Sequence, residues 1–119
     1  MQHTEQQDRR HRIEDEILAD AYGPYEQQIA WHNYLSGMLD FPFRAQVRRR
    51  RRDRCELLRE VEVLRLEEAD EGSDEQRVEV IDLEEQFSFS VPLEELQNVQ
   101  ADDETYEAVE DWKYWKRNG

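Results

Sequence analysis

The segment Leu39-Asp40-Phe41-Pro42-Phe43-Arg44-Ala45 decides the fold, because it separates a helical N-terminal part from a part with strand character. Pro42 cannot continue a helix, and it moves the preceding Phe41 away from helical backbone angles. Apolar residues at helical spacing come before this segment, and short alternating patterns come after it. We therefore predict helices before Pro42 and a sheet after it.

Two helices are expected before the break. The first is predicted from apolar residues that recur three and four positions apart: Ile13, Ile17, Leu18 and Ala21. Gly23 is well placed to end this helix, and Pro24 suits the first turn of the next one. The second helix, predicted over 24–39, is apolar over a wide face. The very short connection indicates a helical hairpin.

Three apolar patterns after the break predict strands, over residues 61–66, 78–81 and 87–91. In the first of them the alternation slips by one residue after Val63, as a β-bulge would cause. Pro92 ends the third strand, and the four residues Leu93-Glu94-Glu95-Leu96 indicate a single helical turn. The tail from Asp102 returns to helical spacing.

The order of these elements predicts an α+β fold. It has an N-terminal helical hairpin, then three or four strands in a small twisted antiparallel sheet, SH3-like or partly closed, and a C-terminal helix. With 119 residues and a mass of 14.5 kDa, the chain has room for one core. We expect a single acidic domain over 1–119, with about the first ten residues mobile.

Charge dominates the composition, with 30 acidic and 16 basic residues and a net charge of −14. Such a charge repels nucleic acid and anionic lipid, so neither is an expected partner. No apolar stretch approaches the ~20 residues of a membrane helix, and no apolar run of a secretory signal follows the N-terminus. The lone Cys55 cannot form an intrachain disulfide. We expect a cytoplasmic monomer.

The charge is unevenly distributed along this single domain. Residues 41–55 hold seven arginines and one aspartate, a net charge of +6, whereas residues 56–111 carry a net charge of −18. The arginine run Arg48–Arg52 has two favoured interpretations: it pairs with the acidic strands, or it belongs to a mobile connection between strands. A third, less favoured alternative is a nucleic-acid contact, because a local basic patch outweighs the net charge at short range.

The densest acidic stretch lies between two predicted strands and holds six carboxylates within residues 67–75. Calcium takes ~6–8 oxygen ligands, and Gly72 permits the sharp turn that would let such oxygens converge. The stretch is not an EF-hand, because placing Gly72 at the sixth loop position puts Val78 where a bidentate acid is required. The alternative is a solvated hairpin tip that only keeps the protein soluble.

Asp40 is a second candidate ligand, since it follows a wide apolar face and precedes the proline. Its alternative role is that of a turn residue at a helix end. The predicted calcium ligands are therefore Asp40, Glu67, Glu68, Asp70, Glu71 and Asp74. Asp40 lies either near the loop acids or at a separate site. The turn at 82–85 could lend a further oxygen to the loop.

Catalytic motifs are not evident, as there is no phosphate-binding glycine loop, nucleophile elbow or histidine pair at metal spacing. We therefore expect a protein that is not an enzyme. His32, on an apolar helix, is more typical of a packed histidine than of a ligand. The alternative to a calcium-binding protein is an acidic interaction module that docks a basic partner.

Several strings together resemble the small cyanobacterial-type calcium-binding proteins that lack EF-hands: Arg12–Tyr22, Trp31–Leu35, Leu39–Ala45, Val61–Leu64, Val91–Leu96 and Asp111–Trp115. The resemblance implies a compact α+β protein of the bacterial cytosol that binds calcium at surface carboxylates, as a buffer or sensor. Asp40 lies inside a matching string and the loop acids do not. The Arg48–Arg52 run also departs from the pattern.

Overall fold

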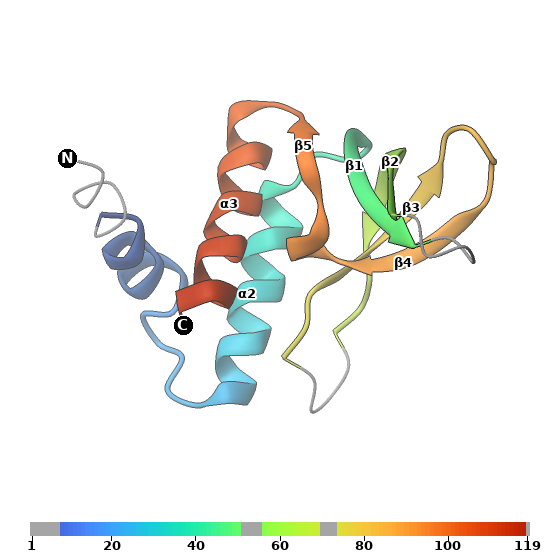
Figure 1. Cartoon of the computed structure of the whole chain (residues 1–119). Helices are drawn as coiled ribbons and strands as arrows, with labels where there is room; N and C mark the ends of the chain where they lie inside the picture. The colour runs from blue at the N-terminus through green and yellow to red at the C-terminus, as the bar shows by residue number, and fades with distance from the viewer. Residues whose placement is uncertain (1–7, 51–55, 70–73, 119) are drawn as a thin grey trace.

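The computed structural model describes residues 8–50, 56–69 and 74–118. Residues 8–12 are α-helical and continue into the first named element. In chain order the elements are η1 (Ile13–Ile17), α2 (Pro24–Met38), β1 (Phe43–Arg50), β2 (Glu56–Leu66), β3 (Arg77–Asp82), β4 (Ser88–Pro92), η2 (Leu93–Glu95), β5 (Gln97–Gln100) and α3 (Asp103–Asn118). This arrangement confirms the predicted α+β class (Figure 1). None of the described helices is long and apolar enough to cross a membrane.

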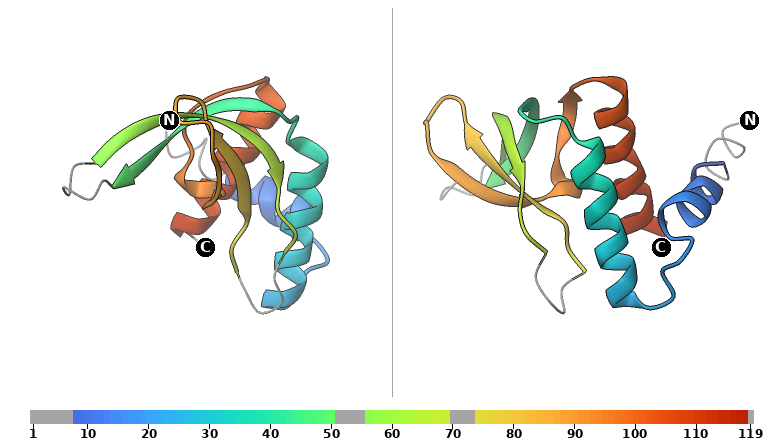
Figure 2. Two further views of the ribbon diagram at one scale, coloured as in Figure 1. Left: turned by 90° about the vertical axis from the view of Figure 1, so that its right-hand side faces the viewer. Right: turned by 180° about the vertical axis from the view of Figure 1, so that it is seen from behind.

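The elements form three layers. Helices α2 and α3 run side by side against one face of the sheet, and the N-terminal helix lies on their outer side (Figures 1 and 2). Helix α2 starts at Pro24 as predicted, with the amide of Gln27 donating to the Gly23 carbonyl at 2.9 Å. Helix α2 runs from one end of the molecule to the other, and Asp40 follows at its far end.

The sheet has the strand order β4-β3-β2-β1-β5, with antiparallel neighbours. It is open, with β4 and β5 at its edges, and it is strongly twisted (Figure 2). The register of β2 on β3 shifts between Val63 and Arg65, which confirms the predicted bulge. The bend lets β2 continue beyond the bulge to the acidic connection at residue 67.

The core lies between the sheet and the two helices. Alternate residues of the central strands are fully buried: Val61, Val63, Val78 and Val80. From the helices come Trp31, Leu35 and Trp112, with the rings of Trp31 and Trp112 packed edge to face at 5.1 Å between centroids. A tryptophan pair is worth about 0.5–1.5 kcal/mol beyond its buried area, so it holds α2 to α3.

Two strands were absent from the sequence-based prediction, which allowed three or four. Strand β5 is only four residues long, and β1 falls on the arginine-rich segment. In β1 the residues Phe43, Ala45 and Val47 are buried, whereas Arg44 and Arg48 are exposed. An alternating strand is therefore present, with arginines in place of the usual uncharged residues on its outer face.

The arginine run begins inside this strand rather than in a loop. Arg48 forms an ion pair with Glu56 of β2 at 3.6 Å, so pairing with the acidic strands describes this residue. The Arg49 guanidinium lies over the rings of Phe87 and Phe89, at 4.9 and 4.4 Å from their centroids. The run's residues 51 and 52 lie outside the described part of the chain.

The first helix ends earlier than predicted. Its last turn is of the π type, with the amide of Leu18 donating to the Ile13 carbonyl at 2.9 Å, and η1 ends at Ile17. Gly23 does not end this helix but is the N-cap residue of α2. Between the two, residues 18–23 form an irregular connection, which leaves a hollow between the N-terminal helix and α2.

Candidate metal centre

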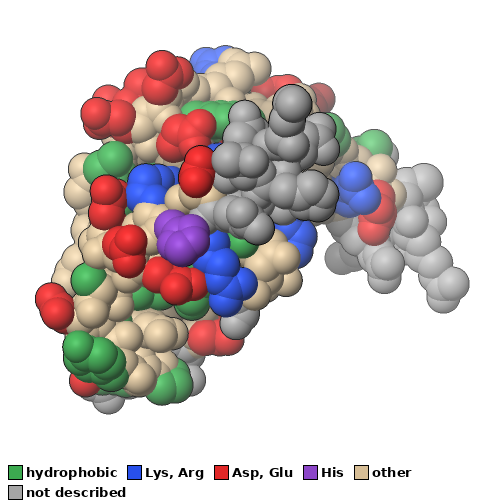
Figure 3. Space-filling model, turned by 90° about the vertical axis from the view of Figure 1, so that its left-hand side faces the viewer, with side chains coloured by type: hydrophobic (Ala, Val, Ile, Leu, Met, Phe, Trp, Pro, Cys, Tyr) green, Lys and Arg blue, Asp and Glu red, His purple; other side chains and the backbone are tan. Residues whose placement is uncertain are grey.

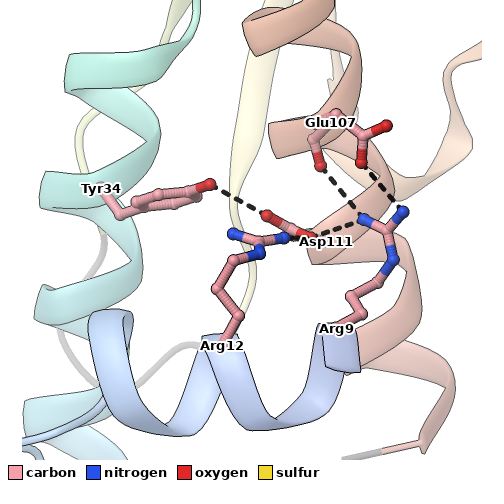
Figure 4. Close-up of polar contacts among 5 residues, drawn as sticks. All are labelled: Arg9, Arg12, Tyr34, Glu107 and Asp111. Carbon is pink, nitrogen blue, oxygen red and sulfur yellow. Dashed lines mark hydrogen bonds and ion pairs between the residues drawn. The ribbon is translucent and has the colours of Figure 1, made fainter. Parts of the chain in front are cut away.

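Both carboxylate oxygens of Asp111, a fully buried residue of α3, are bound within the fold and are not left for a metal. Three other side chains hold them (Figure 4). Arg9 approaches it at 2.5 Å, Arg12 forms a second ion pair with the same oxygen, and the Tyr34 hydroxyl donates to the other oxygen at 2.9 Å. Arg9 also bridges to Glu107 at 2.9 Å. This network fixes the N-terminal helix to α2 and α3.

The charges of the network balance, with two guanidinium groups against two carboxylates. Burial raises the pKa of the Tyr34 hydroxyl, and the negative charge of Asp111 raises it further. Tyr34 therefore remains a hydrogen-bond donor at physiological pH. The network is a structural clamp that joins three helical segments.

Asp82, at the end of β3, is a second buried carboxylate engaged within the fold. Arg59 binds both of its oxygens, at 2.9 and 3.1 Å, and the amides of Glu84 and Glu85 donate to it at 2.9 Å. Hydrogen bonding to Arg59, opposed by burial, lowers the pKa of Asp82 to about 2. Its role is to close the turn between β3 and β4.

This turn lies at the opposite end of β3 from the acidic connection, since Asp82 pairs with Val61 whereas residue 78 pairs with Leu66. The suggestion that the turn at 82–85 lends an oxygen to the loop is therefore wrong. The turn was correctly predicted as a turn, but the strand between the two places is six residues long. Such a strand spans roughly 20 Å.

The connection between β2 and β3 is fixed to α2 at both ends. Gln28 donates its side-chain amide to the Glu75 carbonyl at 2.7 Å, and His32 Nε2 lies 3.0 Å from the Glu67 carbonyl. A carbonyl only accepts, so Nε2 of His32 donates. Next to it, the amide of Glu67 donates to the Arg77 carbonyl at 2.8 Å. The backbone on both sides of the loop is thus held in place.

Arg77, the first residue of β3, lies beside acidic side chains of this connection. Its guanidinium is 3.2 Å from the Glu75 carboxylate and donates to the Ser90 hydroxyl at 2.9 Å. That hydroxyl in turn donates to the Glu67 carboxylate at 2.7 Å. A hydroxyl polarised in this way orients Glu67, while the arginine charge lowers the local negative potential.

The remaining predicted loop ligands differ in what holds them. Glu68 is exposed, and its carboxylate has no hydrogen-bond or ion-pair partner among the described residues. Asp74 is exposed as well, with Lys116 at 3.7 Å from its carboxylate. Asp70 and Glu71 lie outside the described residues. The connection therefore offers carboxylates that are available to a cation.

Asp40 is held by its backbone, and its carboxylate is exposed and has no partner in the described part of the chain. The amide of Asp40 donates to the Thr105 hydroxyl at 3.0 Å, and that hydroxyl lies 3.4 Å from the Met38 carbonyl. Thr105 belongs to the first turn of α3, which also carries the exposed Asp103 and Glu104. Figure 3 shows acidic side chains gathered at this upper end of the molecule.

Asp40 and the loop acids are at different places along α2. The Glu67 carbonyl is bound at His32, whereas Asp40 follows the helix end at Met38, six residues further on. Six residues span about 9 Å of helix axis. Two oxygens that share one calcium ion lie at most about 5 Å apart, so this spacing of the two backbone attachments favours two separate locations. The separate location of Asp40 stays a prediction.

The donor chemistry fits calcium, although the oxygens of the described residues do not converge. Within residues 8–50, 56–69 and 74–118, no three acidic, histidine or cysteine side chains are grouped as a metal would require. The available groups are carboxylates and backbone carbonyls, which are hard ligands suited to calcium. A closed site would need further oxygens from water or from movement of the acidic side chains.

Comparison with known proteins identifies the family. A family model for CcbP proteins, described as calcium binding, matches residues 11–116. The chain belongs to the CcbP family of calcium-binding proteins. A search of curated proteins gives no match.

Two solved structures are similar to this CcbP family member over nearly its whole length. The crystal structure of Anabaena CcbP is 33% identical, covers 92% of this chain and 89% of its own, and superposes with a TM-score of 0.79. A calcium binding protein in the calcium-binding form is 34% identical, with coverages of 95% and 92% and a TM-score of 0.78. The sequence resemblance is thereby confirmed.

Three residues of the candidate centre escaped the sequence-based prediction of ligands. Gln28 and His32 anchor the loop, and Arg77 neutralises part of it. A buried glutamine or a half-buried histidine on a helix gives no sequence signal for a loop partner some 40 residues away. In the sequence, Arg77 is the first basic residue after the acidic stretch. This position is a weak signal that it pairs with the acids.

Proposed function

We propose that this protein binds calcium at two separate surface locations, one at Asp40 and one at the connection between β2 and β3. The observation that carries the proposal is the family match over 11–116, which includes both locations. The ligands would come from Asp40 at the first location, and from Glu67, Glu68, Asp70, Glu71 and Asp74 at the second. The exposed carboxylates of Asp40 and Glu68, which have no partner among the described residues, support this assignment.

The binding mode would differ from that of an EF-hand. In an EF-hand a 12-residue loop joins two helices. Here the acidic connection joins two antiparallel strands, and Asp40 lies between a helix and a strand. Both contexts support coordination by surface carboxylates, with oxygens drawn from different elements.

The role would be that of a calcium buffer or sensor in the cytosol, performed by a monomer without enzymatic activity. A calcium ion held at exposed carboxylates would keep several water ligands. Such a site exchanges its ligands readily, which suits reversible binding. A sensor would change its structure when calcium binds, and a buffer would not. Backbone amide spectra with and without calcium separate these two roles.

A calorimetric titration with calcium, at physiological salt with millimolar magnesium present, tests the proposal. We expect saturable binding with whole-number stoichiometry. Heats that do not saturate, or that magnesium abolishes, would show that the acids form only a solvated anionic surface. In that case the calcium function would have to be abandoned for this chain.

Variants separate the two locations. Asp40→Asn is expected to remove one binding event, and Glu68→Gln with Asp74→Asn to weaken the other. The matched control for the double variant is Asp15→Asn with Glu16→Gln, two exposed acids on η1 whose loss changes the net charge by the same two units, and Asp15→Asn alone is the control for Asp40→Asn. If the control weakens binding as much as the test variants do, general electrostatics and not ligation explains the affinity.

The second candidate function is docking of a basic protein partner. The observation in its favour is the net charge of −14 combined with an apolar surface bordered by acids. The two functions are compatible, since a calcium sensor also requires a partner.

A further inference from the structure

An open hollow of about 390 Å³ lies between the N-terminal helix and α2. It has no role in the proposed calcium sites. Its apolar lining includes Ile17, Ala21, Ile29 and Ala30. The hollow exists because η1 ends in a π turn at Ile17, and the connection to α2 then runs irregularly to Gly23. We name this hollow, together with Tyr22 and Tyr25 beside it, the tyrosine groove.

Large apolar side chains are unusually exposed here. Tyr22 is 86% exposed, Tyr25 60% and Ile29 40%. They make up half of the exposed large hydrophobic side chains among the described residues, although they come from only eight consecutive positions. Figure 3 shows hydrophobic side chains gathered at this lower end of the molecule, where α2 begins. Such a gathering marks an interaction surface more often than chance exposure.

The border of the groove has a single sign of charge. Three acidic residues line it, namely Glu16, Asp20 and Glu26, whereas no lysine or arginine from the described part of the chain does. The Glu26 carboxylate accepts the amide of Tyr22 at 3.0 Å, which ties it to the turn. Glu16 and Asp20 are exposed and have no partner among the described residues. A partner seated in the groove would thus meet negative charge at its edges.

The shape favours a helix as the occupant. Tyr25 and Ile29 stand four residues apart on α2 and form one stripe along it, with the N-terminal helix as the opposite wall. An amphipathic helix fills such a space with apolar residues at spacings of three and four. A second copy of this chain is disfavoured, because it would bring its own acids against Glu16 and Asp20.

We infer that the tyrosine groove docks a basic amphipathic helix of a partner protein. Its apolar stripe covers Ile29 and the two tyrosines, and its lysines or arginines pair with Glu16 and Asp20. This inference rests on the second candidate function, docking of a basic partner, and names its site and the kind of partner. It does not rest on calcium binding, because none of the groove residues is a proposed calcium ligand.

The test measures binding of a synthetic peptide of about 18 residues, made of leucine and lysine with an apolar stripe at helical spacing. The full chain is used in chelator at ~0.15 M salt, so that calcium and long-range charge contribute little. The comparison peptide has the same composition in an order without a stripe. We expect saturable binding of the first peptide, with at least about tenfold weaker binding of the second.

Two variants locate the site, and a third serves as control. Tyr25→Ser with Ile29→Ser, and separately Glu16→Gln with Asp20→Asn, should each weaken binding by about fivefold or more. Asp103→Asn with Glu104→Gln removes the same charge at the other end of the molecule and should change affinity less than twofold. All changed side chains are exposed, so the fold is retained.

Equal binding of the two peptides, or equal loss with the control variant, would overturn the inference in favour of diffuse attraction to an acidic surface. Absence of binding would overturn it as well. Self-association that the Tyr25→Ser, Ile29→Ser variant abolishes would replace the partner helix with a second copy. The calcium titration is a separate measurement, so failure of either proposal is recognised independently.

Discussion

At the scale of single residues, burial decides what each acid does. Asp82 and Asp111 are fully buried and each forms an ion pair with arginine, so their charges are compensated within the fold. Asp40 and Glu68 are exposed and without partners among the described residues. The sequence shows both pairs only as acids among 30, and it cannot tell them apart. Only the long-range pairing with Arg12 and Arg59 makes the difference visible.

The pKa of Asp82 leads to a prediction about acid stability. Its value of about 2 in the folded protein lies below the 3.8 of an unhindered aspartate, so the folded state favours the charged form. The Arg59 contact therefore stabilises the fold fully above pH ~4 and loses this effect as pH falls towards ~2. The stability advantage of the native chain over Asp82→Asn should be constant above pH ~4 and shrink below it.

Urea unfolding at a series of pH values measures this difference. The control is Glu84→Gln, which removes an exposed partner of the same arginine, with its carboxylate 3.1 Å away. A difference between native and Asp82→Asn protein that stayed constant down to pH ~2 would contradict the assignment of this pKa to the Arg59 contact.

Arg77 leads to a prediction about affinity at the acidic connection. Its positive charge lies beside Glu75 and, through Ser90, is linked to Glu67. Removing it by Arg77→Gln should tighten calcium binding at this location by about two- to fivefold, the range expected for one screened positive charge in the neighbourhood of a divalent ion. Calorimetric titration of the variant measures the change.

Arg65→Gln is the matched control, because Arg65 pairs with Glu79 on the exposed face of β2 and β3. It removes one positive charge without touching the network around Ser90. Equal tightening in both variants would mean that net charge alone sets the affinity, and the connection would lose its support as a specific site.

At the scale of elements, the sequence correctly predicted the features that depend only on neighbouring residues in the chain. Pro24 started α2 where expected, the slip after Val63 gave the bulge, and the residues after Pro92 formed one helical turn as η2. Strand β1 was missed because its outward positions are arginines, which have no strong strand preference. Its assignment depends on pairing with β2 and β5, which local patterns do not contain.

The candidate ligands were chosen from the sequence by composition, and their role as calcium ligands stays a prediction. The acids at Asp40 and at 67–75 were selected by their types and spacing. Their spacing along α2 depends on the contact of His32 with the Glu67 carbonyl, which joins positions 35 residues apart. No period or motif encodes such a contact, so the sequence alone could not favour two locations over one.

The clamp at Asp111 predicts how the N-terminal helix is held. Asp111→Asn leaves the partly exposed Arg9 and Arg12 beside a neutral amide, and the Tyr34 hydroxyl loses a charged acceptor. Because both guanidinium groups still reach solvent and Arg9 keeps Glu107, the free energy of unfolding should fall by about 1.5–3 kcal/mol, the range for hydrogen bonds to charged groups. Urea denaturation gives the value.

Glu107→Gln is the comparison, since Glu107 is half exposed and binds the same Arg9. It should cost less than about 1 kcal/mol, as exposed pairs do. Amide exchange of residues 8–17 should accelerate in Asp111→Asn well before the core amides do. Unchanged exchange in this segment would show that the clamp does not hold the N-terminal helix.

At the scale of the whole molecule, self-repulsion opposes the fold. A net charge of −14 on 119 residues raises the free energy of any compact state. Salt relieves this repulsion by screening, and a bound divalent cation relieves it by neutralising charge at one place. Both effects stabilise the folded chain, but only the second requires particular residues.

This distinction gives a prediction for thermal unfolding at constant ionic strength. Calcium at one hundred times its dissociation constant should stabilise the fold by about 2.7 kcal/mol per site, which raises Tm by roughly 8–15 °C in a chain of this size. Magnesium at the same concentration should raise Tm much less, because it gives up its water reluctantly to surface carboxylates. In Asp40→Asn the calcium increment should shrink, whereas the rise in Tm with sodium chloride should remain. Equal increments from calcium and magnesium in both proteins would mean that screening alone acts, and that the carboxylates bind no ion specifically.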